Sequence, residues 1–317
     1  MKMSPRVPLT RRQVLQAVVT TGVGATLSLP LAAADAPSLI TRAIPSTGER
    51  LPVMGIGTNA FRDANFAELR AVLKRMHELG GRVIDTAALY GESEGVIGRA
   101  LAELGLGKQM FLATKFNAPG IGNWRPEQIS AEDSFERSVA RLKSGVIDLM
   151  MIHQLDSVEL IMDTLLKYKR SGRVRYVGIT TASPEEHPRL IQYLKTYPLD
   201  FVQVDYSLGN RDAASSVFPV AVARKIAVMV AVPLGGRRSS LLTGVSSRQL
   251  PAWAADFDAA SWSQFFLKYV VSHPAVTCAI PGSAKLPHLE DNQAAGRGRL
   301  PDAATRRKME EFWDSGA

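Results

Sequence analysis

The chain contains a single cysteine, Cys278, among its 317 residues. One thiol cannot form an intrachain disulfide, and it cannot supply the several sulfur ligands of a cysteine-based metal cluster. Cys278 lies in the apolar run VTCAI, residues 276–280, which favours a buried, unreactive thiol over a nucleophile. The sequence therefore excludes disulfide scaffolds and zinc sites built from cysteines.

The chain also lacks a strong excess of one charge beyond its first residues. Its formal net charge is +8, but residues 1–34 hold basic side chains and no acidic ones. The rest of the chain holds 34 of the 38 basic residues and all 30 acidic ones, so its balance is only +4. Such a balance is not typical of nucleic-acid binding, and we expect no nucleic-acid partner.

Residues 1–34 have the pattern of an export signal. Basic residues come first, then an apolar stretch rich in small residues, and three alanines at 32–34 fit an A-x-A cleavage site. The pair Arg11 and Arg12 is typical of the twin-arginine signal, which exports folded proteins. An uncleaved membrane anchor is the alternative, but the apolar run is weak and contains Pro30. We expect a periplasmic or secreted protein without stable membrane insertion after processing.

Residues 39–317 have the pattern of one domain, without internal repeats or low-complexity linkers. Two short apolar runs flank a turn-rich segment in LITRAIPSTGERLPVMGIGT, which predicts a β-hairpin. Strands are predicted at residues 53–57, 82–86, 110–115, 147–153, 174–179, 201–204, 228–232 and 276–280. Helices are predicted at residues 66–79, 94–104, 132–142, 158–168, 184–194, 213–224, 262–272 and 301–312.

The predicted strands are almost continuously apolar, and each is followed by a helix, which indicates a parallel sheet covered by helices. Eight such units in about 265 residues match a closed (β/α)8 barrel, a TIM barrel, with the hairpin capping its lower end. An open doubly wound sheet is the alternative. It fits less well because no strand-to-helix junction carries the GxGxxG of a dinucleotide-binding sheet.

Titratable residues end three neighbouring predicted strands. Asp85, Lys115 and His153 each close a strand, at the end of the barrel where active sites lie. Tyr90 follows Asp85 after a short loop, and Ser93 is a candidate N-cap for the next helix. Each residue alone has an ordinary structural explanation. Together they are expected to converge, because neighbouring strands bring their ends to one place.

The four side chains suit proton transfer to a carbonyl oxygen. Lys115 beside Tyr90 would favour the phenolate, and Asp85 would serve as the counter-ion of the buried ammonium. His153 would hydrogen-bond the oxygen that Tyr90 protonates. Because a proton donor alone reduces nothing, the hydride must come from a cofactor.

With these residues the sequence resembles the aldo-keto reductase family over residues 39–292. The matching segments are MGIGT, VIDTAALYG, FLATKF, IDLMMIHQLD, VRYVGIT, FVQVDYS, VPLG and IPGSAKLPHLEDN. The resemblance implies that the family's catalytic tetrad falls on Asp85, Tyr90, Lys115 and His153. It also implies NADPH-dependent reduction of an aldehyde or ketone, or the reverse oxidation of an alcohol.

The resemblance also implies where NADPH or NADP would lie. The residues implied are Thr58 near the cofactor, Gln203 at the nicotinamide amide, and Leu234, Gly235, Ser283 and Asn292 along the nucleotide. Thr180 and Thr181 stand where the family often has Ser-Asn, and Ala231 and Val232 stand where an aromatic often stacks on the nicotinamide. The phosphate loop keeps only Lys285 and His288 as basic residues, so NAD remains open beside NADP.

Phe61 and Trp124 are candidates for substrate contact, because both lie in loops expected above the barrel mouth. For both aromatics, packing against loop neighbours is the alternative.

Three functions are compatible with this pattern. The leading prediction is a periplasmic oxidoreductase for a small carbonyl or alcohol, with a redox partner of unknown identity that restores its tightly held cofactor. The second is a cofactor-binding sensor or binding module with the same barrel and little turnover, which the missing aromatic favours and the intact tetrad opposes. The third is an unrelated barrel hydrolase or lyase, although no paired carboxylates or multi-histidine set ends the strands.

Overall fold

The computed structural model describes residues 37, 39–116, 129–236 and 240–316. The export signal predicted at residues 1–34 and the candidate Trp124 lie outside these residues. No helix in the described part of the chain is long and apolar enough to span a bilayer.

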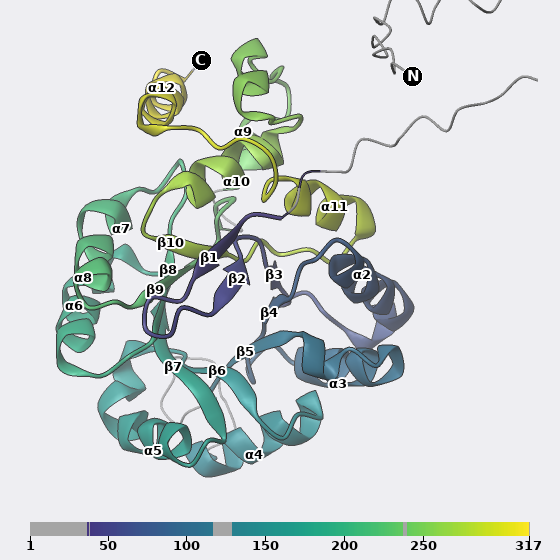
Figure 1. Cartoon of the computed structure of the whole chain (residues 1–317), viewed down its shortest axis with the longest axis vertical. Coiled ribbons are helices and arrows are strands. Elements are labelled where there is room, and N and C mark those ends of the chain that lie inside the picture. The colour runs from purple at the N-terminus through teal and green to yellow at the C-terminus, as the bar shows by residue number, and fades with distance from the viewer. Residues whose placement is uncertain (1–36, 38, 117–128, 237–239, 317) are drawn as a thin grey trace, which may run out of the picture. The chain divides into compact units, whose positions relative to one another are not determined.

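Eight parallel strands form a barrel at the centre of the molecule, as predicted (Figure 1). They are β3 Ile56–Gly57, β4 Val83–Asp85, β5 Phe111–Lys115, β6 Ile147–Ile152, β7 Val174–Thr181, β8 Phe201–Asp205, β9 Ala227–Ala231 and β10 Val276–Ala279. Each strand pairs with the next along the chain. Parallel bridges from Met54 to Ala279 and from Gly57 to Gly282 close the ring between β3 and β10.

The first barrel strand is shorter than predicted. The prediction placed it at residues 53–57, but β3 covers only Ile56–Gly57. The N–H of Val53 donates instead to the carbonyl of Ile40, at the edge of the hairpin. The predicted strand at residues 53–57 is therefore divided: its start bonds to the hairpin, and its end forms the barrel strand β3.

The N-terminal hairpin caps the end of the barrel at which the strands begin. Its strands β1 Thr41–Ala43 and β2 Arg50–Pro52 pair antiparallel. Ile44 and Leu51 belong to the same buried cluster as the barrel residues Phe111, Tyr176 and Phe201. Figure 1 shows the hairpin in front of the strands at this end, which confirms the predicted cap. The other end of the barrel remains available for a site.

Helices surround the barrel (Figure 1). They are α2 Phe66–Glu78, α3 Ser93–Leu104, α4 Ala131–Leu142, α5 Val158–Arg170, α6 His187–Thr196, α7 Asp212–Ser215, α8 Val217–Ala223, α9 Leu241–Gly244, α10 Trp262–Ser272, α11 Leu286–Ala294 and α12 Ala303–Asp314. Short 3-10 turns cover Asp63–Asn65, Gly107–Gln109, Leu155–Ser157, Pro184–Glu186 and Ala252–Phe257. The predicted helix at residues 213–224 is divided into α7 and α8. Pro219 has no N–H to donate to the preceding helical turn, so it is accommodated in the first turn of a separate helix, α8.

Candidate active site

The four predicted catalytic side chains meet at the open end of the barrel. Asp85 is the last residue of β4, Lys115 is the last residue of β5, and His153 directly follows β6. Tyr90 comes from the loop after β4. Because β4, β5 and β6 are neighbours in the sheet, their ends converge as the sequence predicted.

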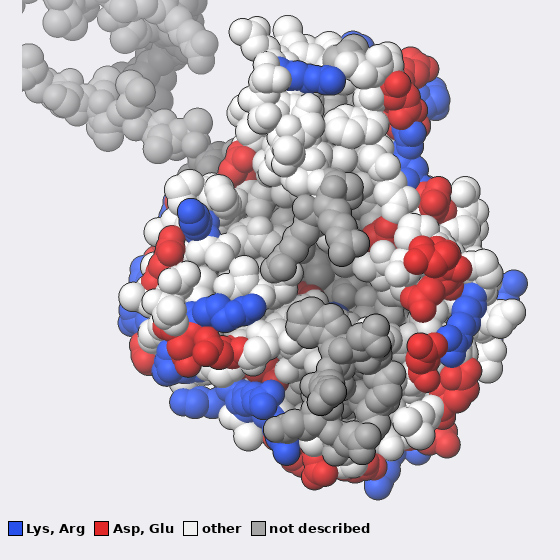
Figure 2. All heavy atoms as spheres, turned by 180° about the vertical axis from the view of Figure 1, so that it is seen from behind, with Lys and Arg blue, Asp and Glu red and all other residues white. Residues whose placement is uncertain are grey.

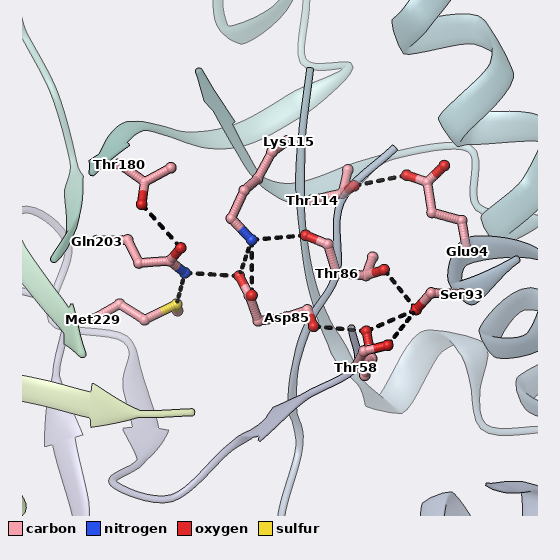
Figure 3. A network of polar contacts seen from close by, with 10 residues as sticks. All are labelled: Thr58, Asp85, Thr86, Ser93, Glu94, Thr114, Lys115, Thr180, Gln203 and Met229. Carbon is pink, nitrogen blue, oxygen red and sulfur yellow. Dashed lines mark hydrogen bonds and ion pairs between the residues drawn. The ribbon is translucent and has the colours of Figure 1, made fainter. Parts of the chain in front are cut away.

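Lys115 and Asp85 form a buried ion pair (Figure 3). The Lys115 Nζ lies 2.8 and 2.7 Å from the two carboxylate oxygens of Asp85, and it donates to the Thr86 carbonyl at 2.8 Å. Both side chains are almost fully buried, with 1% and 3% exposed. Burial lowers the pKa of the Lys115 ammonium, but Asp85 and Tyr90 outweigh burial, and the pKa is raised overall. Lys115 therefore stays charged at neutral pH.

Tyr90 lies against this ion pair. The Lys115 Nζ is 5.2 Å from the centroid of the Tyr90 ring. The Lys115 charge lowers the pKa of Tyr90, but burial and the Asp85 carboxylate together outweigh it and leave the pKa raised. The prediction that Lys115 would shift Tyr90 toward the phenolate is therefore wrong for the overall pKa. Lys115 does lower the pKa of Tyr90, but Asp85, its counter-ion, raises that pKa again. Tyr90 remains a phenol at neutral pH and keeps a proton to donate.

His153 is a neutral partner for Tyr90. The two rings meet edge to face, with centroids 5.7 Å apart and an angle of 77° between their planes. Burial and the charge of Lys115 lower the pKa of His153 to about 3. Its Nδ1 atom is buried and has no hydrogen-bond partner among the described residues. An unpaired buried nitrogen is unfavourable, which favours a ligand that would satisfy it.

Ser93 does not cap α3, contrary to the prediction. It lies inside the helix, and the N-cap residue is Glu92, whose side chain makes no capping bond. The Ser93 Oγ instead lies 2.8 Å from Thr58 Oγ1 and 2.9 Å from Thr86 Oγ1 (Figure 3). The hydroxyl is buried, so it bonds these buried strand-end partners, and it fixes the loop that carries Tyr90 to the strand ends.

A cavity of about 710 Å³ opens over the strand ends. Among the predicted residues, it is lined by Thr58, Asp85, Tyr90, His153, Thr180, Thr181, Gln203, Leu234 and Gly235. Ala231 and Val232, at the place of the missing aromatic, line it as well. Figure 2 views the molecule from the side opposite the hairpin, and the charged side chains lie mostly around the margin of that face.

Five of the remaining predicted residues do not line the cavity. Asn292 donates to the Ser283 Oγ at 2.7 Å, so the two side chains bind each other, and Lys285 and His288 are exposed at the start of α11. Phe61 is fully buried in the hydrophobic core, which contradicts its predicted contact with substrate. The N–H of Phe61 donates to the carbonyl of Thr58, so the loop turns back at this point. Burial of the phenyl ring stabilises the fold by about 1.5–3 kcal/mol, which explains why Phe61 lies in the core.

Glu186 is a cavity residue that the sequence did not reveal. It lies in the 3-10 turn after β7, lines the cavity, and accepts a hydrogen bond from the Thr181 hydroxyl. The available signal was its position a few residues beyond a strand end. The prediction considered only residues at the strand ends themselves and so missed it.

Comparison with known proteins agrees with this geometry. The sequence model described as "Aldo/keto reductase family" matches residues 53–310. The chain is 30% identical over 267 residues to methylglyoxal reductase YeaE of Escherichia coli, covering 82% of this chain and 88% of that protein. It is 27% identical to aldo-keto reductase str7 of Strobilurus tenacellus, covering 76% of this chain and 80% of that protein.

Solved structures share the fold. Aldo-keto reductase AKR11C1 from Bacillus halodurans, in its holo form, superposes with a TM-score of 0.70 at 21% identity, covering 86% of this chain and 96% of that one. An aldo-keto reductase from Klebsiella pneumoniae in complex with NADPH superposes with a TM-score of 0.69 at 22% identity, covering 87% and 95%. At these identities the likeness concerns the fold alone.

Proposed function

The chain belongs to the aldo/keto reductase family, and on that premise we propose that it reduces a small aldehyde or ketone with NADPH, or oxidises the alcohol in reverse. The observation that carries the proposal is the buried Lys115–Asp85 pair beneath a protonated Tyr90, with the neutral His153 at its side. This arrangement provides one proton for a carbonyl oxygen at neutral pH. A sensor with little turnover would not need a proton donor of this kind.

The cavity fits a nicotinamide nucleotide. Its volume of about 710 Å³ is within the range of cofactor sites, and its walls combine threonine hydroxyls with the turn at Leu234 and Gly235. The buried, unpaired Nδ1 of His153 is a further sign that a ligand completes the site. NADPH, when bound, supplies the hydride. The solved relative from Klebsiella pneumoniae with NADPH supports this choice.

The chain's own residues would handle the proton. Tyr90 donates its phenolic proton to the carbonyl oxygen as that oxygen gains negative charge. Lys115 then stabilises the phenolate that remains, and Asp85 keeps the ammonium in place. His153 orients the carbonyl as a neutral hydrogen-bond donor.

Lys285 and His288, exposed at the start of α11, would bind the 2′-phosphate that distinguishes NADP from NAD.

The purified protein is expected to oxidise NADPH when supplied with at least one member of a panel of aldehydes, ketones and quinones. Loss of absorbance at 340 nm measures the reaction, and NADH in place of NADPH measures the preference between the two. Tight binding of NADPH without turnover of any carbonyl would contradict the proposal and favour the sensor.

We also propose that residues 1–34 direct export of the folded, cofactor-loaded protein to the periplasm. The basic start, the small-residue apolar stretch and the alanines at 32–34 support this proposal. In that compartment a redox partner would have to restore the reduced cofactor.

Replacement of both Arg11 and Arg12 by lysine is expected to keep the protein in the cytoplasm, because the twin-arginine pathway requires the arginine pair. Cell fractionation followed by immunoblotting measures the distribution. Arg6→Lys is the matched control, since it changes an arginine outside the pair and should leave export intact. Continued export of the double variant would rule out the twin-arginine route.

A further inference from the structure

Glu186 places a carboxylate in the wall of the catalytic cavity. It is the last residue of the 3-10 turn Pro184–Glu186, which follows β7, and it lines the same cavity as Tyr90 and His153. The residue is partly exposed, so its side chain is neither sealed in the core nor free in solvent. The carboxylate therefore borders the space that a substrate held by Tyr90 and His153 would occupy.

The local structure holds this side chain but leaves part of its carboxylate unpaired. The Oε2 atom of Glu186 accepts a hydrogen bond from the Thr181 hydroxyl, whereas Oε1 has no hydrogen-bond partner among the described residues. The Thr181 Oγ1 in turn accepts from the backbone N–H of Ser183, which ties Glu186 to the end of β7. Oε1 therefore remains able to accept a hydrogen bond from a ligand.

No basic side chain in the described part of the chain neutralises this carboxylate. Glu186 forms no ion pair there, and Arg189, the basic residue one helical turn further along, pairs with Asp156. Glu186 is also the N-cap residue of α6, and a helix N-terminus favours a negative charge. It therefore adds an uncompensated negative charge to the described wall of the cavity.

The other titratable groups in this wall do not offset the charge. Asp85 is paired with Lys115, whose side chain is 1% exposed. Tyr90 keeps its proton, and His153 is neutral because its pKa is lowered to about 3. Within the described residues, no lysine or arginine lines the cavity. A substrate carboxylate would therefore meet no free cation there, whereas a cationic group would meet Glu186.

We propose that Glu186 is a specificity-determining residue, which favours carbonyl substrates that carry a positive charge over those that carry a negative charge. The inference rests on the proposed function and narrows its substrate class to aldehydes and ketones with a cationic nitrogen. Glu186 would bind that nitrogen through Oε1, while Tyr90 donates to the carbonyl oxygen. Neutral carbonyl compounds would react with a lower kcat/KM.

Glu186→Gln changes the charge and little else. The glutamine keeps the length of the side chain and can still accept from the Thr181 hydroxyl, so the turn after β7 should persist. Three substrates are compared: cationic para-trimethylammonio-benzaldehyde, its neutral isostere para-tert-butyl-benzaldehyde, and anionic para-carboxy-benzaldehyde. Each kcat/KM is divided by that of the neutral compound. Comparing these ratios between variant and unaltered protein cancels the intrinsic reactivity of each aldehyde.

In the variant we expect the cationic-to-neutral ratio to fall about tenfold and the anionic-to-neutral ratio to rise about tenfold. Added salt should reduce both changes, because it screens charges at the open mouth of the cavity. Unchanged ratios would overturn the inference. A change of about tenfold in the Kd for NADP, with unchanged ratios, would also overturn it and assign Glu186 to the cofactor.

Glu185→Gln is the matched control. Glu185 precedes Glu186 in the same turn, but it is exposed and does not line the cavity. The substitution makes the same chemical change and the same change in net charge. Both ratios should stay within about twofold of those of the unaltered protein, because solvent and salt screen an exposed charge. Equal effects of the two variants would contradict a contact at Glu186.

Binding without turnover separates this inference from the proposed function. Benzamidine carries a positive charge, and benzamide is its neutral analogue of nearly the same shape. With NADP present, the unaltered protein should bind benzamidine about tenfold more tightly than benzamide in NMR titrations, and Glu186→Gln should remove the difference. Equal affinities in the unaltered protein would overturn the inference. The expected preference without reduction of any aldehyde would disprove the proposed function alone.

Discussion

Tyr90→Phe is expected to lower kcat for carbonyl reduction by about 10²- to 10⁴-fold, the usual contribution of a positioned general acid. The substitution removes the phenolic O–H but keeps the ring, which meets His153 at 5.7 Å. NADPH should still bind, because the change removes no threonine hydroxyl and does not alter the turn at Leu234 and Gly235. Steady-state rates and a single-turnover measurement of NADPH oxidation would establish the effect on chemistry.

Tyr193→Phe is the control for this substitution. Tyr193 is a tyrosine of α6 whose hydroxyl donates to Glu159, and it does not line the cavity. Loss of that hydroxyl should leave kcat unchanged within about twofold. If Tyr90→Phe keeps more than about a tenth of the original kcat, Tyr90 is not the general acid and the proposed mechanism fails.

Lys115→Met should cost about 3–5 kcal/mol of folding free energy, because it leaves the Asp85 carboxylate buried without its counter-ion. Activity should be lost as well. Without Lys115, the charge that lowers the pKa of Tyr90 is gone, so the pKa rises further and Tyr90 becomes a weaker acid. Chemical denaturation at neutral pH and kcat measure the two effects.

The double variant Asp85→Leu with Lys115→Met should regain most of the lost stability but none of the activity, because no buried charge is left unpaired. Glu136→Gln serves as a control, since it removes only the exposed ion pair with Arg173, leaves Arg173 stacked on Phe135, and should cost only about 0–1 kcal/mol. If the double variant is as unstable as Lys115→Met, the cost arises from lost packing and not from an unpaired charge.

Local patterns were enough to predict the barrel and the ends of its strands. Asp85 and Lys115 terminate β4 and β5 where the apolar runs end, and His153 directly follows β6. The predictions failed where a side chain had a choice of buried partners. Ser93 bonds Thr58 in place of capping α3, and Phe61 enters the core in place of the cavity. The sequence identifies the hydroxyl of Ser93 and the ring of Phe61, but it does not show which residues pack against them in the folded chain.

Strand and helix periodicity was enough to identify the residues at the open end of the barrel, because such periodicity is local and is read within about ten to fifteen residues. Which of these residues touch each other depends on the fold as a whole. Gln203 and Asp85 are 118 positions apart and lie on opposite walls, yet they are 2.8 Å apart. That contact depends on the register and closure of all eight strands, and so does the raised pKa of Tyr90, which reflects Lys115, burial and Asp85 together.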